Sequence, residues 1–178
     1  MFSSKLLYKP THHSHNSKMD DINIIEHIKG APGFRIFGLG PNCKPSRGVE
    51  QLQMLLTKNS SWGKKRNIKD LKKMLAGSSV VISLWSKDKL IGFGRANTDE
   101  IFRAVLWDII IEKDYQNLGL GTKIVHKLLT NPSVSNVQRI YIMTTHCESF
   151  YEKIGFKNAS NQMLMIYDKS MDILKINQ

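Results

Sequence analysis

Cysteine is scarce in this chain, which has only Cys43 and Cys147 among its 178 residues. Two cysteines cannot make the dense disulfide framework that stabilises many small secreted domains. Neither cysteine belongs to a CxxC pair, which excludes zinc ribbons and thioredoxin-type redox motifs. The sequence therefore favours a reducing compartment, and we expect the protein to use no metal.

Long apolar runs are missing as well. The longest, Val80–Trp85 and Ala104–Trp107, fall far short of the roughly 18 to 20 residues that a bilayer-spanning helix needs. With 41% hydrophobic and 23% charged residues, the chain can still bury a core, and its length suits one ordinary domain. We expect a folded protein that does not enter a membrane.

Acidic residues are few: 15 Asp and Glu stand against 26 Lys and Arg, which gives a formal net charge of +11. Lysine supplies 20 of the 26, a bias that an AT-rich genome can produce without any selection for binding. The surplus nevertheless favours anionic ligands. Its densest stretch, Lys64–Lys73, is better explained as a solvated helix face than as a nucleic-acid patch, because no aromatic residues are interleaved with the bases.

The first 31 residues show no apolar periodicity, and we expect a loosely attached tail followed by one domain over residues 32–178. His12, His13 and His15 lie close together there, but neighbouring imidazoles without a rigid frame favour a solvated tail over a metal site. The stretch also lacks the arginines and the amphipathic pattern of a transit peptide.

Apolar spacing and turn residues predict the elements of an α/β domain with a mixed sheet. Helices are expected over Val49–Leu56, after an N-cap at Asn67, from Gly119, and from a Thr145–Glu148 capping box to Gly155. Strands are expected at 34–39, 78–85, 89–97, 103–111, 139–144 and 162–168, of which the second and third form a hairpin.

The most informative segment runs from the strand ending at Ile111 through Gln116-Asn-Leu-Gly119-Leu-Gly121 into a helix. Glycines let the backbone approach a ligand, and the free N–H groups of a helix start bind phosphate. From the spacing alone, an anion site and simple loop packing are equally supported. The GLGPNC segment indicates a plain loop, and the GFG segment, inside a strand, indicates a bulge or a close backbone contact. No GxxxxGK[ST] or GxSxG motif supports a nucleoside triphosphatase or serine hydrolase.

The Q-x-x-G-x-G signature at Gln116, Gly119 and Gly121, followed by FYEKIGF at 150–156, resembles the GNAT acetyltransferase family. The resemblance covers residues 34–168, and WSKDKLIGFGRA, FRAVLWDIII and MTTHCESFYEKIGF are similar to its plastid and cyanobacterial branch. It implies a central, mostly antiparallel mixed sheet of six to seven strands flanked by about four helices. Asn117 departs from the glycine usual in that branch. Because Asn tolerates positive φ, we expect the loop to keep the same backbone conformation.

The resemblance also implies a cofactor site for acetyl-CoA, used as a co-substrate. Main-chain amides of the glycine-bearing segment would bind its pyrophosphate, and the preceding strand would pair with the pantetheine arm. The implied cofactor-binding residues are Ile109, Ile110, Ile111, Gln116, Asn117, Leu118, Gly119, Leu120, Gly121 and Thr122.

For catalysis, the resemblance assigns Tyr151 as the acid that protonates the departing thiolate, whereas packing against the sheet is the alternative role for that ring. A main-chain N–H near Ile109 is the oxyanion donor if the strand carries a bulge there, as in relatives. Cys147, one helical turn before Tyr151, has no activating partners that would support a covalent acyl-cysteine route.

Asp108 is the first candidate for the general base. Strand alternation places it on one face with Leu106 and Ile110, an apolar setting that would raise its pKa. The opposing interpretation is a carboxylate that bonds a backbone group, and the two are equally supported. His146 is the second candidate, and a water chain is a third route.

The acceptor implied by the branch is a primary amine of a protein or peptide, at an N-terminal α-amine, a lysine or both. Small amines are an alternative acceptor class, and the alternative to an enzyme is a non-catalytic basic module that binds RNA or protein. We expect a monomer or homodimer, located in the plastid stroma or, as the alternative, in a bacterial cytoplasm.

Overall fold

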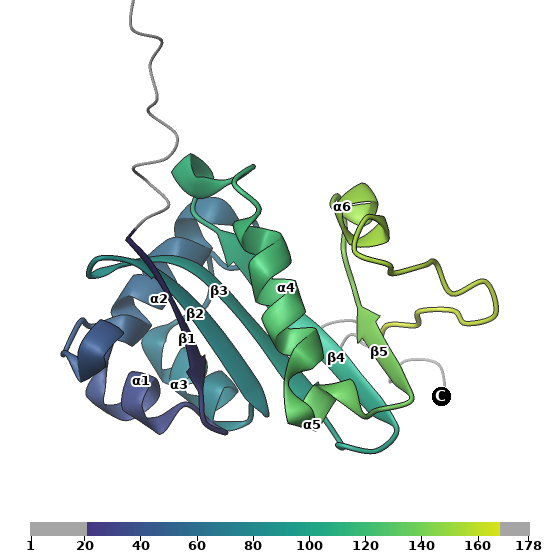
Figure 1. The fold of residues 1–178 in the computed structure, drawn as a ribbon, viewed down its shortest axis with the longest axis horizontal. Coiled ribbons are helices and arrows are strands. Elements are labelled where there is room, and N and C mark those ends of the chain that lie inside the picture. Colours follow the sequence, from purple (N-terminus) through teal and green to yellow (C-terminus); the bar gives the residue numbers. More distant parts are fainter. Residues whose placement is uncertain (1–20, 168–178) are drawn as a thin grey trace, which may run out of the picture. The chain divides into compact units, whose positions relative to one another are not determined.

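The computed structural model describes residues 21–167 and contains one five-stranded sheet in the order β1-β2-β3-β4-β5 (Figure 1). The chain divides into two compact units, of which the first ends at Met143 and the second begins at Thr144. The strands are β1 (Ile22–His27), β2 (Val80–Ser86), β3 (Lys89–Thr98), β4 (Arg103–Ile111) and β5 (Arg139–Ile142). The helices are α1 (Pro32–Phe37), α2 (Gly48–Asn59), α3 (Ile68–Ala76), α4 (Leu120–Thr130), α5 (Pro132–Ser135) and α6 (Glu148–Glu152), with 3₁₀ turns η1 (Pro41–Cys43) and η2 (Lys113–Tyr115).

The sheet is mixed and mostly antiparallel, as predicted. Strands β1 to β4 pair antiparallel in sequence order, and β5 returns parallel to β4. A parallel return requires a crossover, which α4 and α5 provide. The described residues contain five strands, against the six to seven expected.

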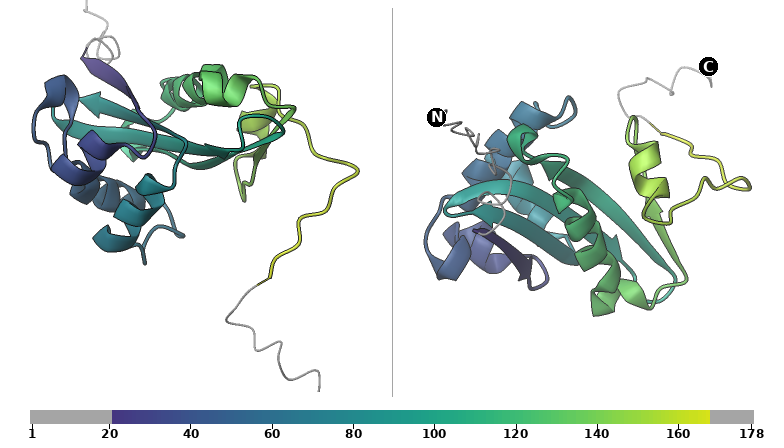
Figure 2. Two further views of the ribbon diagram at one scale, coloured as in Figure 1. Left: turned by 90° about the horizontal axis from the view of Figure 1, so that it is seen from below. Right: turned by 45° about the horizontal axis from the view of Figure 1, so that its top comes forward.

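Helices cover both faces of this sheet in the first unit (Figure 2). On one face, side chains of α1, α2 and α3 form a cluster with the sheet residues Trp85, Phe93 and Ile110. On the other face lies α4, whose buried residues include Ile124 and Leu128. Gly94 faces that helix, since a Cβ there would lie 2.5 Å from Ile124 Cγ2. The predicted close approach at the GFG segment is therefore confirmed.

Several predicted elements are confirmed. The hairpin forms as β2 and β3, the long third strand forms as β4, and helices occupy the expected places at α2, α3 and α4. Asn67 caps α3 by accepting a hydrogen bond from the Asp70 amide at 2.9 Å. No helix within residues 21–167 is both long and apolar enough to cross a membrane.

The strand predicted at 34–39 is wrong, because the chain forms α1 there. Pro32 occupies the first turn of this helix, and Gly38 ends it with a φ of 63°. Proline at the start and glycine just past the end are the signals that bound a helix. Phe34, which the apolar run placed in a strand, is fully buried from α1 instead.

The loose tail predicted to reach residue 31 is wrong for its last ten residues. Residues Ile22–His27 form the edge strand β1 and pair with β2 from Ile22↔Ser86 to His27↔Val81. The strand is half-buried and short, so its sequence of apolar and polar residues gives little indication of a strand until its pairing with β2 is known. The prediction for residues 1–20, including the three histidines, lies outside the described residues.

Two predictions in the second unit are also wrong. Residues 162–167 form no strand, and the apolar side chains from Met163 to Tyr167 are exposed; Asp168 lies outside the described residues. The Thr145–Glu148 capping box does not form, because the N-cap of α6 is Cys147, two residues later than Thr145. Thr144 Oγ1 instead accepts from the Cys147 amide at 3.1 Å.

Candidate cofactor and catalytic site

The segment predicted to bind phosphate forms a tight turn at the start of α4. Asn117 and Gly119 both have left-handed backbones, with φ values of 60° and 73°, so the prediction for Asn117 is confirmed. The first helical hydrogen bond of α4 runs from the Lys123 amide to Gly119 O at 3.1 Å. The amides of residues 120–122 precede that bond and have no intrahelical acceptor, which makes them donors for an anion.

The space beside this turn is open at its glycine. A Cβ built on Gly119 would meet no atom within 4 Å, so the glycine is required by its φ rather than by crowding. Gln116 holds the turn to the sheet, since its Nε2 donates to Ile111 O at 3.0 Å. The side chain of Gln116 thus has a structural use that the sequence motif alone does not reveal.

A buried carboxylate braces the segment that leads into this turn. Glu112 is 3% exposed, and its Oε1 lies 2.5 Å from Lys58 Nζ at the end of α2. Asn59 donates to Glu112 Oε2 at 3.5 Å and accepts from the Lys113 amide at 3.1 Å. Hydrogen bonding to Glu112 raises the pKa of the exposed Lys58. Sequence reasoning missed this brace, although an acid directly after an apolar strand is a usable signal.

Strand β4 has an open edge beside the turn. Its parallel partner β5 pairs only with Arg103–Leu106, so within the described residues 107–111 have no strand neighbour on that side. The Glu112 amide donates to Ile91 O of β3 at 2.8 Å. Because successive N–H groups of a strand alternate in direction, the Ile111 amide points away from β3. An extended ligand can therefore pair with this edge.

The bulge on which the main-chain oxyanion donor near Ile109 depends is present in β4. The register passes from Phe93↔Ile110 to Arg95↔Trp107, so Asp108 and Ile109 together oppose Gly94. Asp108 has a φ of 55°, which is rare for a residue other than glycine in a strand. Its side chain is 5% exposed although the residue as a whole is only half-buried, so the exposed part of Asp108 is main chain.

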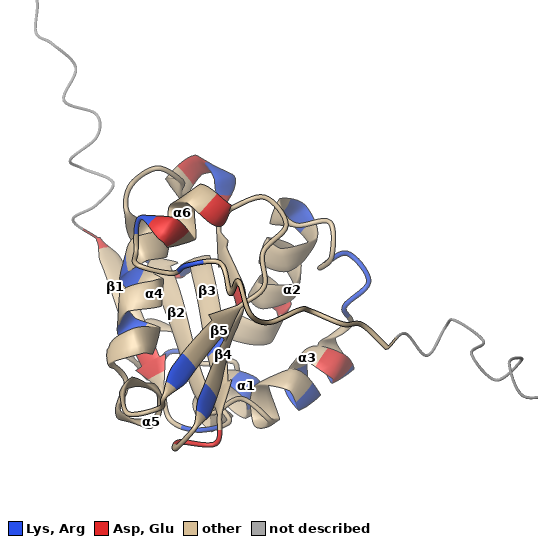
Figure 3. Ribbon diagram, turned by 90° about the vertical axis from the view of Figure 1, so that its right-hand side faces the viewer, with Lys and Arg blue, Asp and Glu red and all other residues tan. Residues whose placement is uncertain are grey.

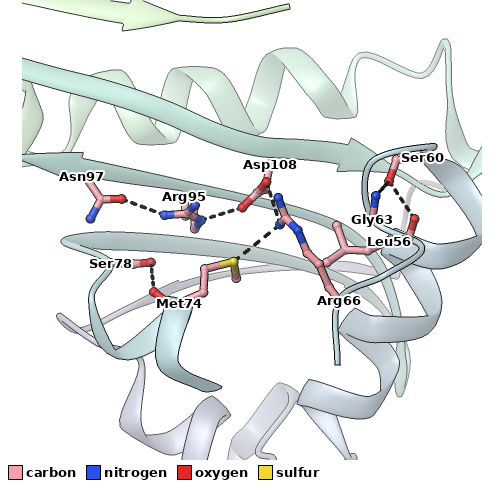
Figure 4. A network of polar contacts seen from close by, with 9 residues as sticks. All are labelled: Leu56, Ser60, Gly63, Arg66, Met74, Ser78, Arg95, Asn97 and Asp108. Atoms are coloured by element: carbon pink, nitrogen blue, oxygen red, sulfur yellow. Dashed lines mark hydrogen bonds and ion pairs between the residues drawn. The ribbon is translucent and has the colours of Figure 1, made fainter. Parts of the chain in front are cut away.

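The carboxylate of Asp108 lies between two arginines (Figure 4). Arg95 Nε donates to Oδ2 at 2.6 Å, and Arg66 Nη1 lies 2.8 Å from Oδ1. The expectation of an apolar setting shared with Leu106 is wrong. The bulge interrupts the alternation, and Leu106 pairs with Ala96 on the face that α4 covers.

Tyr151 is buried in the second unit, with 8% of its surface exposed. Its ring makes edge-to-face contacts with Phe150 and Phe156, at centroid distances of 4.8 and 5.8 Å. Burial, together with the nearby Cys147, raises the pKa of the phenol to about 12. The hydroxyl is therefore a proton donor throughout the neutral range, and the ring packs as well.

The other predicted catalytic residue of the second unit, His146, is exposed beside the N-cap of α6. Asp108, the strand residues 109–111 and the turn residues 116–122 all belong to the first unit. Among the residues that the structure describes, no three His, Cys, Asp or Glu side chains gather in a way that could hold a metal.

Known relatives match much of this chain. It is 39% identical over 97 residues to the uncharacterized N-acetyltransferase ycf52 of Pyropia yezoensis, covering 52% of this chain and 56% of that protein. It is 31% identical over 111 residues to a ycf52-like N-acetyltransferase of Prochlorococcus marinus, covering 60% and 61%. It is 34% identical over 70 residues to GCN5-related N-acetyltransferase 2, chloroplastic, of Arabidopsis thaliana, covering 39% and 27%. The chain thus spans about half the length of the curated relatives it matches.

The fold is shared with solved acetyltransferase structures. A GNAT family acetyltransferase from Streptococcus pneumoniae superposes with a TM-score of 0.61 at 19% identity, covering 83% of this chain and 97% of that one. The model of the acetyltransferase (GNAT) domain matches residues 49–165. That match contains β2 to β5, the bulge and the turn before α4, and it extends through α6. The chain belongs to the GNAT acetyltransferase family, and its relatives lie in the plastid and cyanobacterial branch.

Proposed function

We propose that this chain is an acetyl-CoA-dependent N-acetyltransferase that transfers an acetyl group to a primary amine of a protein or peptide. One observation carries the proposal: a turn with unpaired helix-start amides lies directly after the open edge of β4. The first feature suits a diphosphate and the second suits an extended arm that carries amides. Acetyl-CoA contains both groups.

The residues present fit this co-substrate. The amides of residues 116–122 would bind the diphosphate, and Ile109, Ile110 and Ile111 would pair through their main chain with the pantetheine arm. The open space at Gly119 leaves room for close approach of an anion. This arrangement would bring the thioester carbonyl toward the bulge of β4.

The transfer proceeds by direct attack in a ternary complex. The neutral amine nitrogen forms a bond to the thioester carbon, and a main-chain N–H at the bulge near Ile109 stabilises the oxyanion. The C–S bond then breaks, and Tyr151 donates its proton to the departing thiolate. The proton lost by the amine passes to His146 or to a chain of water molecules.

The acceptor is an N-terminal α-amine, a lysine or both. An α-amine has a reference pKa of about 7.7 to 8.0 against about 10.4 for lysine, so more of it is neutral and reactive near pH 7.5. This difference favours α-amines. A polycationic amine is a poorer fit, because the net charge of +11 repels it.

The experiment incubates the protein with acetyl-CoA and two peptide sets, one with free α-amines and one with only lysine amines. We expect thiol release and an added acetyl mass only when an amine is supplied, with the α-amine set faster. A third set of reactions supplies small arylalkylamines as acceptors. No thiol release from any arm, together with salt-sensitive binding to RNA, contradicts the proposal and favours the non-catalytic module.

We further propose a location in the plastid stroma, because the Arabidopsis relative is named chloroplastic. The relative from Prochlorococcus marinus supports the bacterial cytoplasm as the alternative. Immunodetection in fractionated cells of the source organism distinguishes the two. Sedimentation analysis of the purified protein distinguishes a monomer from a homodimer.

A further inference from the structure

We propose that Asp108 is a positioning residue, whose carboxylate is clamped by Arg66 and Arg95 so that the bulge of β4 presents its main chain to the thioester. This inference rests on the proposed function and refines it, because it removes Asp108 from the role of general base. It begins from the backbone. A φ of 55° is unfavourable for an aspartate, so the surrounding structure must hold it in place.

The clamp supplies that restraint. Each carboxylate oxygen has its own guanidinium partner, Oδ2 with Arg95 at 2.6 Å and Oδ1 with Arg66 at 2.8 Å. The charge-assisted hydrogen bond from Arg95 is stronger than a neutral one, and both it and the ion pair with Arg66 form while the Asp108 side chain is 5% exposed. Rotation of the Asp108 backbone out of its left-handed conformation would break both of them.

The same contacts argue against proton transfer. A general base needs a free lone pair aimed at the proton it accepts. Each oxygen of Asp108 already has a guanidinium partner, and the side chain is only 5% exposed, so the carboxylate is poorly placed to accept a proton from an incoming amine. Arg66 and Arg95 are the charged groups that face this carboxylate in Figure 4.

The two arginines are themselves anchored to different elements. Arg95 Nη1 donates to Asn97 Oδ1 at 2.7 Å, and Asn97 Nδ2 donates to Gly77 O at 2.5 Å after α3. The Arg95 guanidinium lies 5.7 Å from the centroid of the Trp107 ring. The bulge is thus tied to β3 and to the end of α3.

Arg66 connects the bulge to the loop between α2 and α3. Its guanidinium lies 4.7 Å from the centroid of the Trp62 ring, and its Nη1 lies 3.6 Å from Met74 Sδ. Its carbonyl accepts from Gln53 Nε2 of α2 at 3.0 Å. The lysine-rich segment predicted to be a solvated face therefore contains one arginine whose contacts point inward to β4.

The test compares Asp108→Asn, Arg95→Gln and the double variant by steady-state kinetics. Positioning predicts that either single change lowers kcat by roughly 100-fold, the cost of misplacing a reacting group by about an ångström. The KM for acetyl-CoA should change far less, because the turn that binds the diphosphate is separate. The double variant should be no slower than the singles, since both remove the same clamp.

A base role predicts a different pattern. Asp108→Asn would then abolish the acidic limb of the pH–rate profile, whereas Arg95→Gln would leave kcat within a few-fold of the parent. That result overturns the proposal. Asp88→Asn, a change at an exposed aspartate in the β2–β3 turn, is the matched control and should leave both kinetics and profile unchanged. Arg66→Lys, a milder change at the clamp, should lower kcat without altering the profile.

Hydrogen exchange over residues 103–111 tests the clamp without any turnover. Faster exchange in both Asp108→Asn and Arg95→Gln, with circular dichroism like that of the parent, supports the positioning role even if no acetylation is found. Unchanged exchange overturns it. Loss of acetyl-CoA binding by the unmodified protein would instead count against the proposed function alone.

Discussion

At the scale of single residues, Tyr151 combines burial with a polar group at its tip. We expect Tyr151→Phe to slow acetyl transfer by roughly 100- to 10,000-fold, because the thiolate loses its proton donor. Acetyl-CoA affinity should stay nearly constant, since the contacts with Phe150 and Phe156 involve the ring and not the hydroxyl. Thiol-release kinetics and titration calorimetry measure the two quantities. Turnover equal to the parent removes Tyr151 from the mechanism.

The raised pKa of Tyr151 sets the pH range over which this acid can act. With a pKa of about 12, the phenol remains protonated at neutral and mildly alkaline pH. Acid catalysis should therefore persist to about pH 10 and fail only as the pH approaches 12. A kcat profile from pH 6 to 10 that falls on its alkaline side, and keeps that fall in Tyr151→Phe, assigns the titration to another group.

Asn117 offers a test of the turn before α4 with a matched pair of variants. Glycine adopts the φ of 60° without strain, so Asn117→Gly should bind acetyl-CoA at least as well as the parent. Valine is β-branched and strained in the left-handed region by about 1 to 3 kcal/mol. Asn117→Val should therefore weaken binding by about tenfold or more. Equal dissociation constants for the two variants would show that the turn does not contact the ligand.

At the scale of elements, the packing of α4 on β3 depends on Gly94. A methyl group there would lie 2.5 Å from Ile124 Cγ2, so α4 must shift. We expect Gly94→Ala to destabilise the fold by about 1 to 3 kcal/mol. Gly77→Ala is the control, because its Cβ would make only contacts of 3.8 Å and its φ is −86°. Urea unfolding measures both, and equal midpoints contradict the prediction.

His27 in strand β1 makes the stability of the fold depend on pH. Its Nε2 lies 2.8 Å from Ser83 Oγ, and burial lowers its pKa from about 6.5 to about 4. The folded state holds the imidazole neutral. Its contribution to the free energy of unfolding is therefore complete above pH 6.5 and is lost as the pH falls toward 4. The loss is at most about 3 kcal/mol. His27→Gln should flatten this part of a plot of melting temperature against pH; an unchanged slope contradicts the assignment.

The elements predicted from sequence are those whose pattern is complete within one segment. The hairpin, β4, α2 to α4 and the φ of Asn117 follow from apolar spacing and local turn chemistry. Strand β1 was missed because a short edge strand is defined by its partner. The arginine clamp on Asp108 was missed because its three residues come from separate segments that only the folded sheet brings together. An aspartate within an apolar strand sequence gives no indication of its ion-pair partners.

At the scale of the whole molecule, the charge of +11 should act on the rate of cofactor capture. Lys and Arg are spread over α3, α4 and the strands β4 and β5 rather than confined to one helix (Figure 3). Long-range attraction of this kind is screened by salt. We expect the association rate of acetyl-CoA to fall about tenfold between 10 and 300 mM salt, with a much smaller change in the dissociation rate. Stopped-flow mixing measures both rates, and a salt-independent association rate excludes steering.

The ion pair between Glu112 and Lys58 mechanically links two parts of the first unit that are far apart in the sequence. It joins the last turn of α2 to the segment that leads into the turn before α4. Stiffening of that turn by the coenzyme should thus slow amide exchange at the end of α2, and Glu112→Gln should abolish the slowing. If the proposed coenzyme binds at the turn before α4, its effect thus reaches the far end of α2 through one buried carboxylate, and exchange at α2 that does not respond to acetyl-CoA contradicts the link.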